Sequence, residues 1–149
     1  MAKKRFGGAY GDTFYGVAID SLNNIYAVGY TQSDITSYYN NALIVKFDSN
    51  LNILAKKRYG GTTVGVNDMN FQNVAIDNSD NVYVVGYTNI EGAGSYDALI
   101  FKLNTNLNIL AKKRYGGINE EKFYNVVTDS IGNIIAVGWT YTEGISAPT

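Results

Sequence analysis

The chain has 149 residues, enough for one ordinary domain, and a formal net charge of -1, so no strong field favours nucleic acid or an anionic membrane. Cysteine and histidine are both absent, which excludes disulfides and any thiolate or imidazole chemistry. No run of about 18 apolar residues is present, so no membrane span is predicted.

Short strands are predicted along the whole chain, punctuated every eight to twelve residues by Gly- or Asn-rich segments. The chain uses thirteen tyrosines and one proline, which favours an all-β protein because Tyr suits a half-buried pleated surface. In chain order the predicted strands are residues 2–6, 15–20, 25–31, 42–47, 53–59, 72–77, 82–88, 98–103, 109–115, 124–129 and 134–140.

These strands belong to an internal repeat. Residues 51–61 return unchanged as residues 107–117, and a shortened copy occupies residues 2–8. The chain is therefore one propeller-repeat domain over residues 1–149, divided into residues 2–54, residues 55–110 and a partial third repeat over residues 111–149. Four antiparallel strands per repeat predict a partial β-propeller of about two and two-thirds four-stranded blades.

The links between strands fall into two groups. The first-to-second and third-to-fourth links are short and alike, as in residues 20–24, 77–81 and 129–133, and each begins with Asp or Asn and ends with Asn. The second-to-third and fourth-to-first links vary in length and sequence. Because a four-stranded meander places these two groups at opposite edges, we expect all variable links on one face of the molecule and all repeated turns on the other.

The run over residues 73–88 resembles the bacterial "seven-bladed β-propeller" (SBBP) repeat, which pairs an Asp-x-x-Gly-Asn turn with a Gly-Tyr-Thr strand end. That family then has an Asp-Ala-x-x-x-Lys strand and a Gly-Gly end, matched here by Asp97, Ala98, Lys102, Gly116 and Gly117. The resemblance implies a propeller fold and an extracellular or cell-surface location, although no signal peptide is recognisable in this chain. It implies no particular activity.

The strand inventory predicts self-association. An arc of two to three blades cannot close a ring and leaves apolar blade faces in water. We therefore expect a homo-oligomer in which the last strands of one copy join residues 2–6 of the next. A dimer of six blades is favoured over a trimer of nine, because propellers have about four to eight blades. No nucleic-acid or membrane partner is expected.

The variable face carries the candidate ligand residues. Aromatic rings stack on sugar faces while amides and carboxylates bond hydroxyls, so this mixture of residues suits carbohydrate recognition, and an ordinary loop surface without a ligand is the alternative. The candidates are Tyr10, Asp12, Tyr38, Tyr39, Asn40, Asp68, Tyr96, Asp97 and Glu120. No catalytic residue, metal ligand set or cofactor is predicted.

Two alternatives remain open beside a non-enzymatic binding or structural module. One is a glycan hydrolase or lyase that uses surface carboxylates such as Asp68, Glu120 and Glu121. The other is an architectural or engineered fragment of a larger propeller with no ligand.

Several repeated residues are interpreted as structural. Asp20, Asp77 and Asp129 are expected to form turns rather than bind calcium. The Lys-Lys-Arg runs of the fourth strands are expected to protect an outer sheet edge. The glycines inside the second strands, Gly29, Gly86 and Gly138, are expected to mark packing sites where a neighbouring blade or a large aromatic side chain comes near.

Overall fold

The computed structural model describes residues 3, 5–33, 39–61, 68–90 and 95–141. Ten strands and no helix are found in these residues. Their bounds are β1 (Asp12–Ile19), β2 (Ile25–Thr31), β3 (Asn41–Phe47), β4 (Ile53–Tyr59), β5 (Met69–Ile76), β6 (Val82–Thr88), β7 (Asp97–Leu103), β8 (Ile109–Tyr115), β9 (Glu121–Thr128) and β10 (Ile134–Thr140).

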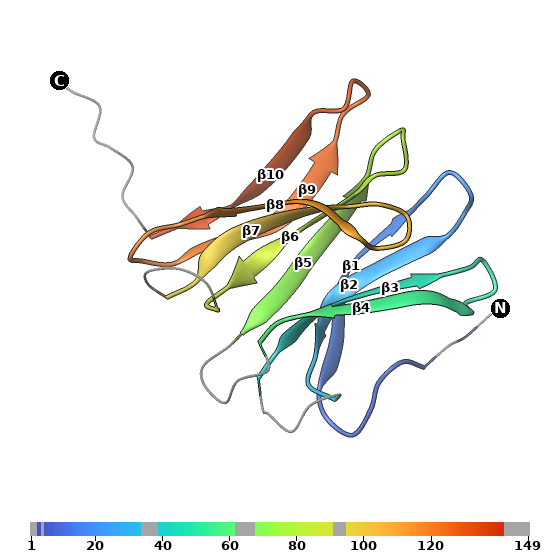
Figure 1. The fold of residues 1–149 in the computed structure, drawn as a ribbon, viewed down its shortest axis with the longest axis horizontal. Helices are drawn as coiled ribbons and strands as arrows, with labels where there is room; N and C mark the ends of the chain where they lie inside the picture. Colours follow the sequence, from blue (N-terminus) through green and yellow to red (C-terminus); the bar gives the residue numbers. More distant parts are fainter. Residues whose placement is uncertain (1–2, 4, 34–38, 62–67, 91–94, 142–149) are drawn as a thin grey trace.

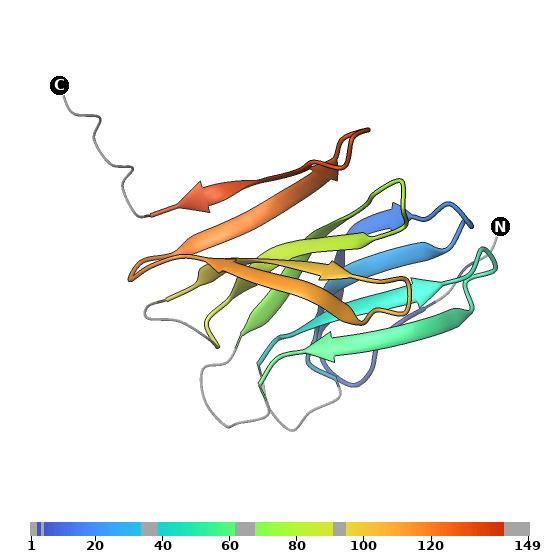
Figure 2. The ribbon, with the colours of Figure 1, turned by 45° about the horizontal axis from the view of Figure 1, so that its top comes forward.

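The strands form three antiparallel sheets that follow chain order. Blade 1 has the order β1-β2-β3-β4, blade 2 the order β5-β6-β7-β8, and β9 pairs with β10 in a half-blade. Figures 1 and 2 show the three sheets side by side, each presenting a face to the next. The predicted all-β architecture of partial propeller blades is confirmed.

The strand predictions are accurate for the second and fourth strands of each blade, whose observed bounds match. The first strands begin three residues earlier than predicted, at Asp12, Met69 and Glu121. The reason is a β-bulge that leaves Tyr15, Gln72 and Tyr124 without a cross-strand partner. The prediction began each first strand at this bulged residue and assigned the three residues before it, which pair with the second strand, to the link.

The second-strand glycines mark the closest approach of two backbones within a blade. Gly86 lies opposite Phe71 beside the bulge, and a Cβ built on it would be 1.9 Å from the backbone oxygen of Asn70. A Cβ built on Gly29 would be 1.8 Å from the backbone oxygen of Thr13, and one built on Gly138 would be 1.8 Å from that of Lys122. The prediction that a neighbouring blade or a large aromatic side chain approaches these glycines is wrong, because the approaching atoms are backbone atoms of the first strand of the same blade.

The strand predicted at residues 2–6 is not found in its described part, since Lys3, Arg5 and Phe6 lie outside any strand. A fourth strand pairs with a third strand, and both third strands that the structure describes, β3 and β7, already pair with β4 and β8. Phe6 nevertheless packs on Phe14 with ring centroids 5.2 Å apart.

This contact of Phe6 repeats at the ends of the fourth strands. Tyr59 packs on Phe71 at 5.7 Å, and Tyr115 packs on Phe123 at the same distance. Phe6 therefore occupies the place that the last aromatic residue of a preceding fourth strand would take.

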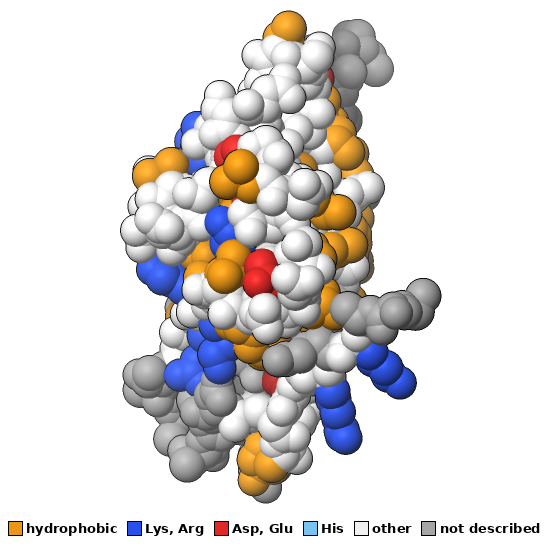
Figure 3. Space-filling view, turned by 90° about the vertical axis from the view of Figure 1, so that its right-hand side faces the viewer, with side chains coloured by type: hydrophobic (Ala, Val, Ile, Leu, Met, Phe, Trp, Pro, Cys, Tyr) orange, Lys and Arg blue, Asp and Glu red, His pale blue; other side chains and the backbone are white. Residues whose placement is uncertain are grey.

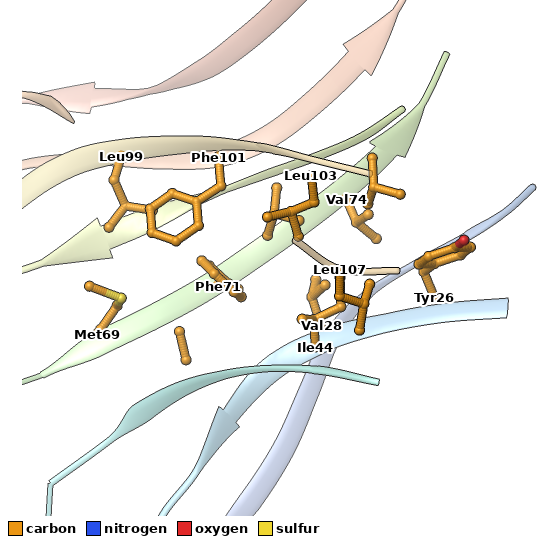
Figure 4. Close-up of a cluster of buried hydrophobic side chains, with 13 residues drawn as sticks. Tyr26, Val28, Ile44, Met69, Phe71, Val74, Leu99, Phe101, Leu103 and Leu107 are labelled. Carbon is orange, nitrogen blue, oxygen red and sulfur yellow. The ribbon is translucent and has the colours of Figure 1, made fainter. Parts of the chain in front are cut away.

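The main core lies between blades 1 and 2. Tyr26, Val28 and Ile44 of blade 1 face Phe101 and other side chains of blade 2, and all are buried (Figure 4). At the far side of blade 1, Leu43 and Val45 are also buried, with Phe6 packed against their cluster. Val17 and Ile19 of β1 lie on the same face, opposite Ala27 and Ile25, and are 64% and 61% exposed. The first blade therefore has the expected exposed apolar face, and Phe6 covers only part of it.

The half-blade at the other end is exposed as well. On β10, Ile135 is 48% exposed and Val137 is 54% exposed, whereas the equivalent Tyr83 and Val85 of β6 are buried against the half-blade. The other edge of β10 has no strand beside it among the described residues.

Two outer edges carry the basic runs, as predicted, because β4 and β8 are the last strands of their sheets. Figure 3, which views the molecule from the side of the repeated turns, shows Lys and Arg side chains along the flank where these strands lie. One lysine of a third strand also braces a turn: Lys46 Nζ donates a hydrogen bond to the backbone oxygen of Thr105 in blade 2, at 3.2 Å.

The repeated turns are closed by their leading Asp side chains. Asp77 accepts hydrogen bonds from the backbone amides of Ser79 and Asn81, both at 2.9 Å, and from the hydroxyl of Tyr83 at 3.1 Å. Burial raises the pKa of Asp77, but these bonds and the side-chain bond from Asn81 outweigh it, so the pKa lies below its usual value. The same balance lowers the pKa of Asp20. The turn-forming role is confirmed.

We expect the Asp side chains of these turns to make the fold less stable at acidic pH. A carboxyl with a lowered folded-state pKa stabilises the fold above its unfolded value of about 3.9, and that contribution is lost as the pH falls through the folded-state pKa. The urea concentration at the midpoint of unfolding should therefore decrease as the pH is lowered below about 4. The double variant Asp20→Asn, Asp77→Asn should show a shallower fall, because the Asn104 side chain already closes an equivalent turn through the amides of Asn106 and Asn108. An unchanged pH profile in this variant would contradict the assignment.

Candidate functional site

The described ends of the variable links lie on one side of the molecule, opposite the repeated turns (Figure 1). In each blade the residue after the second strand donates its backbone amide to the residue before the first strand. These bonds join Gln32 to Gly11, Asn89 to Asp68 and Tyr141 to Glu120, at 2.8–3.0 Å. The predicted separation of the two link groups is thereby confirmed, and this side is called the loop side below.

Asp68 is the centre of a polar cluster on the loop side that joins blades 1 and 2. Its Oδ1 accepts a hydrogen bond from the backbone amide of Asn40, and its Oδ2 accepts one from the hydroxyl of Tyr96, both at 3.0 Å. Burial, followed by the charge of Asp68, raises the pKa of Tyr96 to about 12. The structure thus brings together three of the predicted site residues, and the hydroxyl of Tyr96 is held as a donor to Asp68.

Lys122 of β9 lies among aromatic rings next to this cluster. Its Nζ is 4.4 Å from the ring centroid of Tyr96 and 4.8 Å from that of Tyr87. It also pairs with Glu120 Oε2 at 3.2 Å. Hydrogen bonding from Ser95, followed by Lys122, lowers the pKa of Glu120, so this carboxyl is ionised at neutral pH. The ammonium group of Lys122 therefore holds the Glu120 carboxylate close to the rings of Tyr87 and Tyr96.

A hollow of about 350 Å³ opens beside Glu120. The side chains of Trp139 and Tyr141 line it, with ring centroids 6.3 Å apart and ring planes at 81°. Both rings are accessible, and the indole nitrogen of Trp139 is anchored by donating a hydrogen bond to the Tyr124 hydroxyl at 2.8 Å. The remaining lining residues are Ser95, Ile118, Asn119 and Glu120. Exposed rings beside an ionised carboxylate and an amide are the groups that bind sugar hydroxyls and ring faces.

Two further predicted residues, Tyr10 and Asp12, lie together at the loop side of blade 1. Asp12 accepts hydrogen bonds from the Gly8 amide, at 2.9 Å, and from the Ser33 hydroxyl. Burial raises the pKa of Asp12, but the bonds from Ser33, Thr31 and Gly8 outweigh it and lower the pKa overall. This carboxylate holds the Gly-Gly link that leads into β1.

Asp97 is the first residue of β7 and is buried, paired with Arg114 at 2.7 Å. Tyr39 lies half-buried on the loop side, and Tyr38 falls outside the described residues. Glu121, named with Glu120 as a carboxylate pair, is buried and accepts a hydrogen bond from the Gly117 amide at 2.9 Å. The predicted carboxylates are therefore engaged by the protein itself in bonds that hold links and strand ends.

Sequence reasoning missed Trp139, Tyr141 and Lys122. Trp139 is the only tryptophan and takes the place of Tyr30 and Tyr87 at the end of the second strand, which is a signal that the repeat alignment contains. Lys122 takes the place of Thr13 and Asn70 in the first strand. Trp139 was counted as strand interior. Lys122 lay in the predicted link before residue 124, but it was not among the aromatic, amide and carboxylate side chains chosen as candidates.

Within the described part of the chain, no three acidic side chains gather in a way that could hold a metal ion. No helix long and apolar enough to span a bilayer occurs there either.

Comparison with known families gives a match for the start of the chain. Residues 3–36, which include β1 and β2, match the family model of the SBBP beta-propeller repeat. The family resemblance predicted from the repeat motifs is confirmed for residues 3–36. None of the curated proteins matches the chain.

Proposed function

We propose that this propeller-repeat chain is a non-enzymatic binding or structural module that self-assembles into a closed ring. The observation that carries the proposal is the exposed half-blade. The surface of β6 that bears Tyr83 and Val85 is buried by the next sheet, while the equivalent surface of β10, with Ile135 and Val137, faces water. Burying this surface against another copy is favourable by about 25 cal/mol for each Å² of apolar area.

The position of Phe6 supports the same assembly. Its ring stands where the end of a preceding fourth strand would lie, so the first residues of one copy are suitably placed to meet the half-blade of another. We favour a dimer, which would contain six blades, and a trimer is the alternative, since rings usually have about four to eight.

We expect the chain to sediment well above its monomer mass of 16.3 kDa at micromolar concentration. The variant Val137→Arg should shift the mass towards the monomer, because it places a charge on the surface that assembly would bury. Leu22→Arg is the matched control, since Leu22 is 76% exposed in a repeated turn. Sedimentation velocity measures all three proteins, and a monomeric native chain at these concentrations would refute assembly.

A second function, carbohydrate binding on the loop side, is favoured by the hollow beside Trp139 and Tyr141. An anchored indole gives a flat apolar surface, and Asn119 and Glu120 give polar groups at its rim. Asn40, Asp68 and Tyr96 would hold the adjoining surface in place. A hydrolase or lyase is less well supported, because Asp68, Glu120 and Glu121 all bond protein groups.

A glycan array followed by titration calorimetry tests this function. The Trp139→Ala variant should weaken binding of any glycan hit by about tenfold or more, roughly 1.4 kcal/mol, because the stacking surface is removed. Ser130→Ala, in a repeated turn on the opposite side, should bind as the native chain does. Equal losses in both variants, or product formation in a parallel hydrolysis assay, would contradict a non-enzymatic loop-side site.

A further inference from the structure

A groove of about 400 Å³ opens between blade 2 and the half-blade. Blade 2 supplies Tyr83, Ile100 and Tyr115 to its wall, and the half-blade supplies Phe123, Ile134 and Ala136. The lining is mainly apolar, with lysines of β7 and β8 at one side. The groove lies beside the edge of β10 that has no neighbouring strand in the described residues.

The interface between blades 1 and 2 shows what fills the equivalent space. There the repeat-equivalent residues Tyr26, Ile44 and Phe71 pack against side chains of a third strand and its turn. Those side chains are Leu99, Phe101, Leu103 and Leu107, all of them buried (Figure 4). The groove thus has the shape left by a missing strand with large apolar side chains at alternate positions.

The pairing of β6 with β7 gives the register for such a strand. Val82, Val84 and Gly86 lie opposite Leu103, Phe101 and Leu99 in an antiparallel ladder. Their equivalents in β10 are Ile134, Ala136 and Gly138. A strand that pairs with β10 in this register places its alternate side chains in the groove, because successive side chains of a strand point to opposite faces.

Three polar groups of the complete interface hold the β7–β8 turn. Lys46 donates to the backbone oxygen of Thr105 at 3.2 Å, and Lys57 donates to the Asn108 side-chain oxygen at 2.8 Å. The Tyr59 hydroxyl donates to the backbone oxygen of Leu107 at 2.9 Å.

All three donors have equivalents at the groove. They are Lys102, Lys113 and Tyr115, and each of them lines it. The groove therefore presents both the apolar wall for a third strand and the donors for the turn that follows it.

We propose that this groove binds a β-hairpin that adds to the edge of β10. The first strand of the hairpin carries large apolar side chains at three alternate positions, and its turn offers a backbone oxygen and an Asn side chain to Lys102, Lys113 and Tyr115. The occupant has the chemistry of the β7–β8 hairpin of this chain. The inference goes beyond assembly of copies, because β3 and β7 already belong to complete blades.

The test uses the full chain and a labelled synthetic peptide with the sequence of residues 96–117, followed by fluorescence anisotropy. A second peptide with Leu99→Ser, Phe101→Ser and Leu103→Ser is the control. We expect saturable binding of the first peptide at one per chain, and binding at least about tenfold weaker for the second, since burial of the apolar side chains drives the contact.

Two neighbouring residues of β10 allow peptide binding in the groove and ring assembly to be tested independently. Ile134 lines the groove, whereas Ile135 points to the exposed end face of the half-blade. Ile134→Arg should abolish peptide binding, and Ile135→Arg should weaken assembly but keep peptide binding within about twofold. Circular dichroism melting of both variants checks that they fold.

The Ile135→Arg protein distinguishes failure of the groove proposal from failure of the assembly proposal, because it can bind the peptide whether or not the native chain assembles. No binding of the peptide to this variant, or equal binding to the variant at Ile134, would overturn the groove proposal. A native chain that is monomeric yet binds the peptide would refute assembly and leave the groove site standing.

Discussion

Replacing Gly86 by alanine is expected to destabilise the chain by about 3 kcal/mol or more. A Cβ at this position would be 1.9 Å from the Asn70 backbone oxygen and 3.0 Å from the Cα of Phe71. Both obstacles are backbone atoms, so no change of side-chain rotamer can relieve the contact. The two strands would have to separate at the bulge, which would break the pairing of β5 with β6 beside the main core.

Gly117→Ala is the matched control, since a Cβ there would meet no atom within 4 Å. Urea denaturation followed by circular dichroism compares the free energies of unfolding of the two variants. If the substitutions at Gly86 and Gly117 had equal effects, the close backbone approach in the second strand would be refuted.

The second large effect is expected for Phe101→Ala. Phe101 lies at the centre of the core between the blades, with ring centroids 5.2 Å from Tyr59 and 5.4 Å from Phe71. Three rings from three different strands meet there, so the surroundings cannot collapse easily around a cavity. The expected loss is about 3–5 kcal/mol, the range for a buried Phe replaced by Ala.

Tyr141→Ala serves as control for an aromatic residue truncated on the surface, because Tyr141 is 70% exposed. Its effect on the free energy of unfolding should stay within about 0.5 kcal/mol. A small loss at Phe101, comparable with that of the control, would show that blades 1 and 2 are not held together by this core.

Much of the fold can be predicted because the chain repeats. The second and fourth strands were placed correctly from their regular apolar patterns and the turns that bound them, as for β6 and β8. The first strands were predicted too short because the residues before the bulge, such as Asp12 and Thr13, were assigned to the link although they pair with β2. The sequence alone does not reveal which of two adjacent residues leaves the ladder.

The candidate site was less accessible to prediction. Asn40, Asp68 and Tyr96 were named because they are polar or aromatic and lie in variable links, and they do lie together. Asp97 met the same criteria but belongs to a strand and pairs with Arg114. Trp139 and Lys122 approach the links only because β9 and β10 lie beside blade 2, a relation that depends on how the sheets pack.

The two ends of the row of blades are unlike each other, since the first exposes Val17 and Ile19 beside a patch covered by Phe6 and the last exposes Ile135 and Val137. Contacts between copies would therefore be head-to-tail, a kind that has no built-in limit on size. Such contacts close a ring when the rotation between copies divides a full turn, and otherwise they grow into open helical filaments. The angle that blade packing sets between adjacent sheets thus decides between a small soluble particle and a fibre.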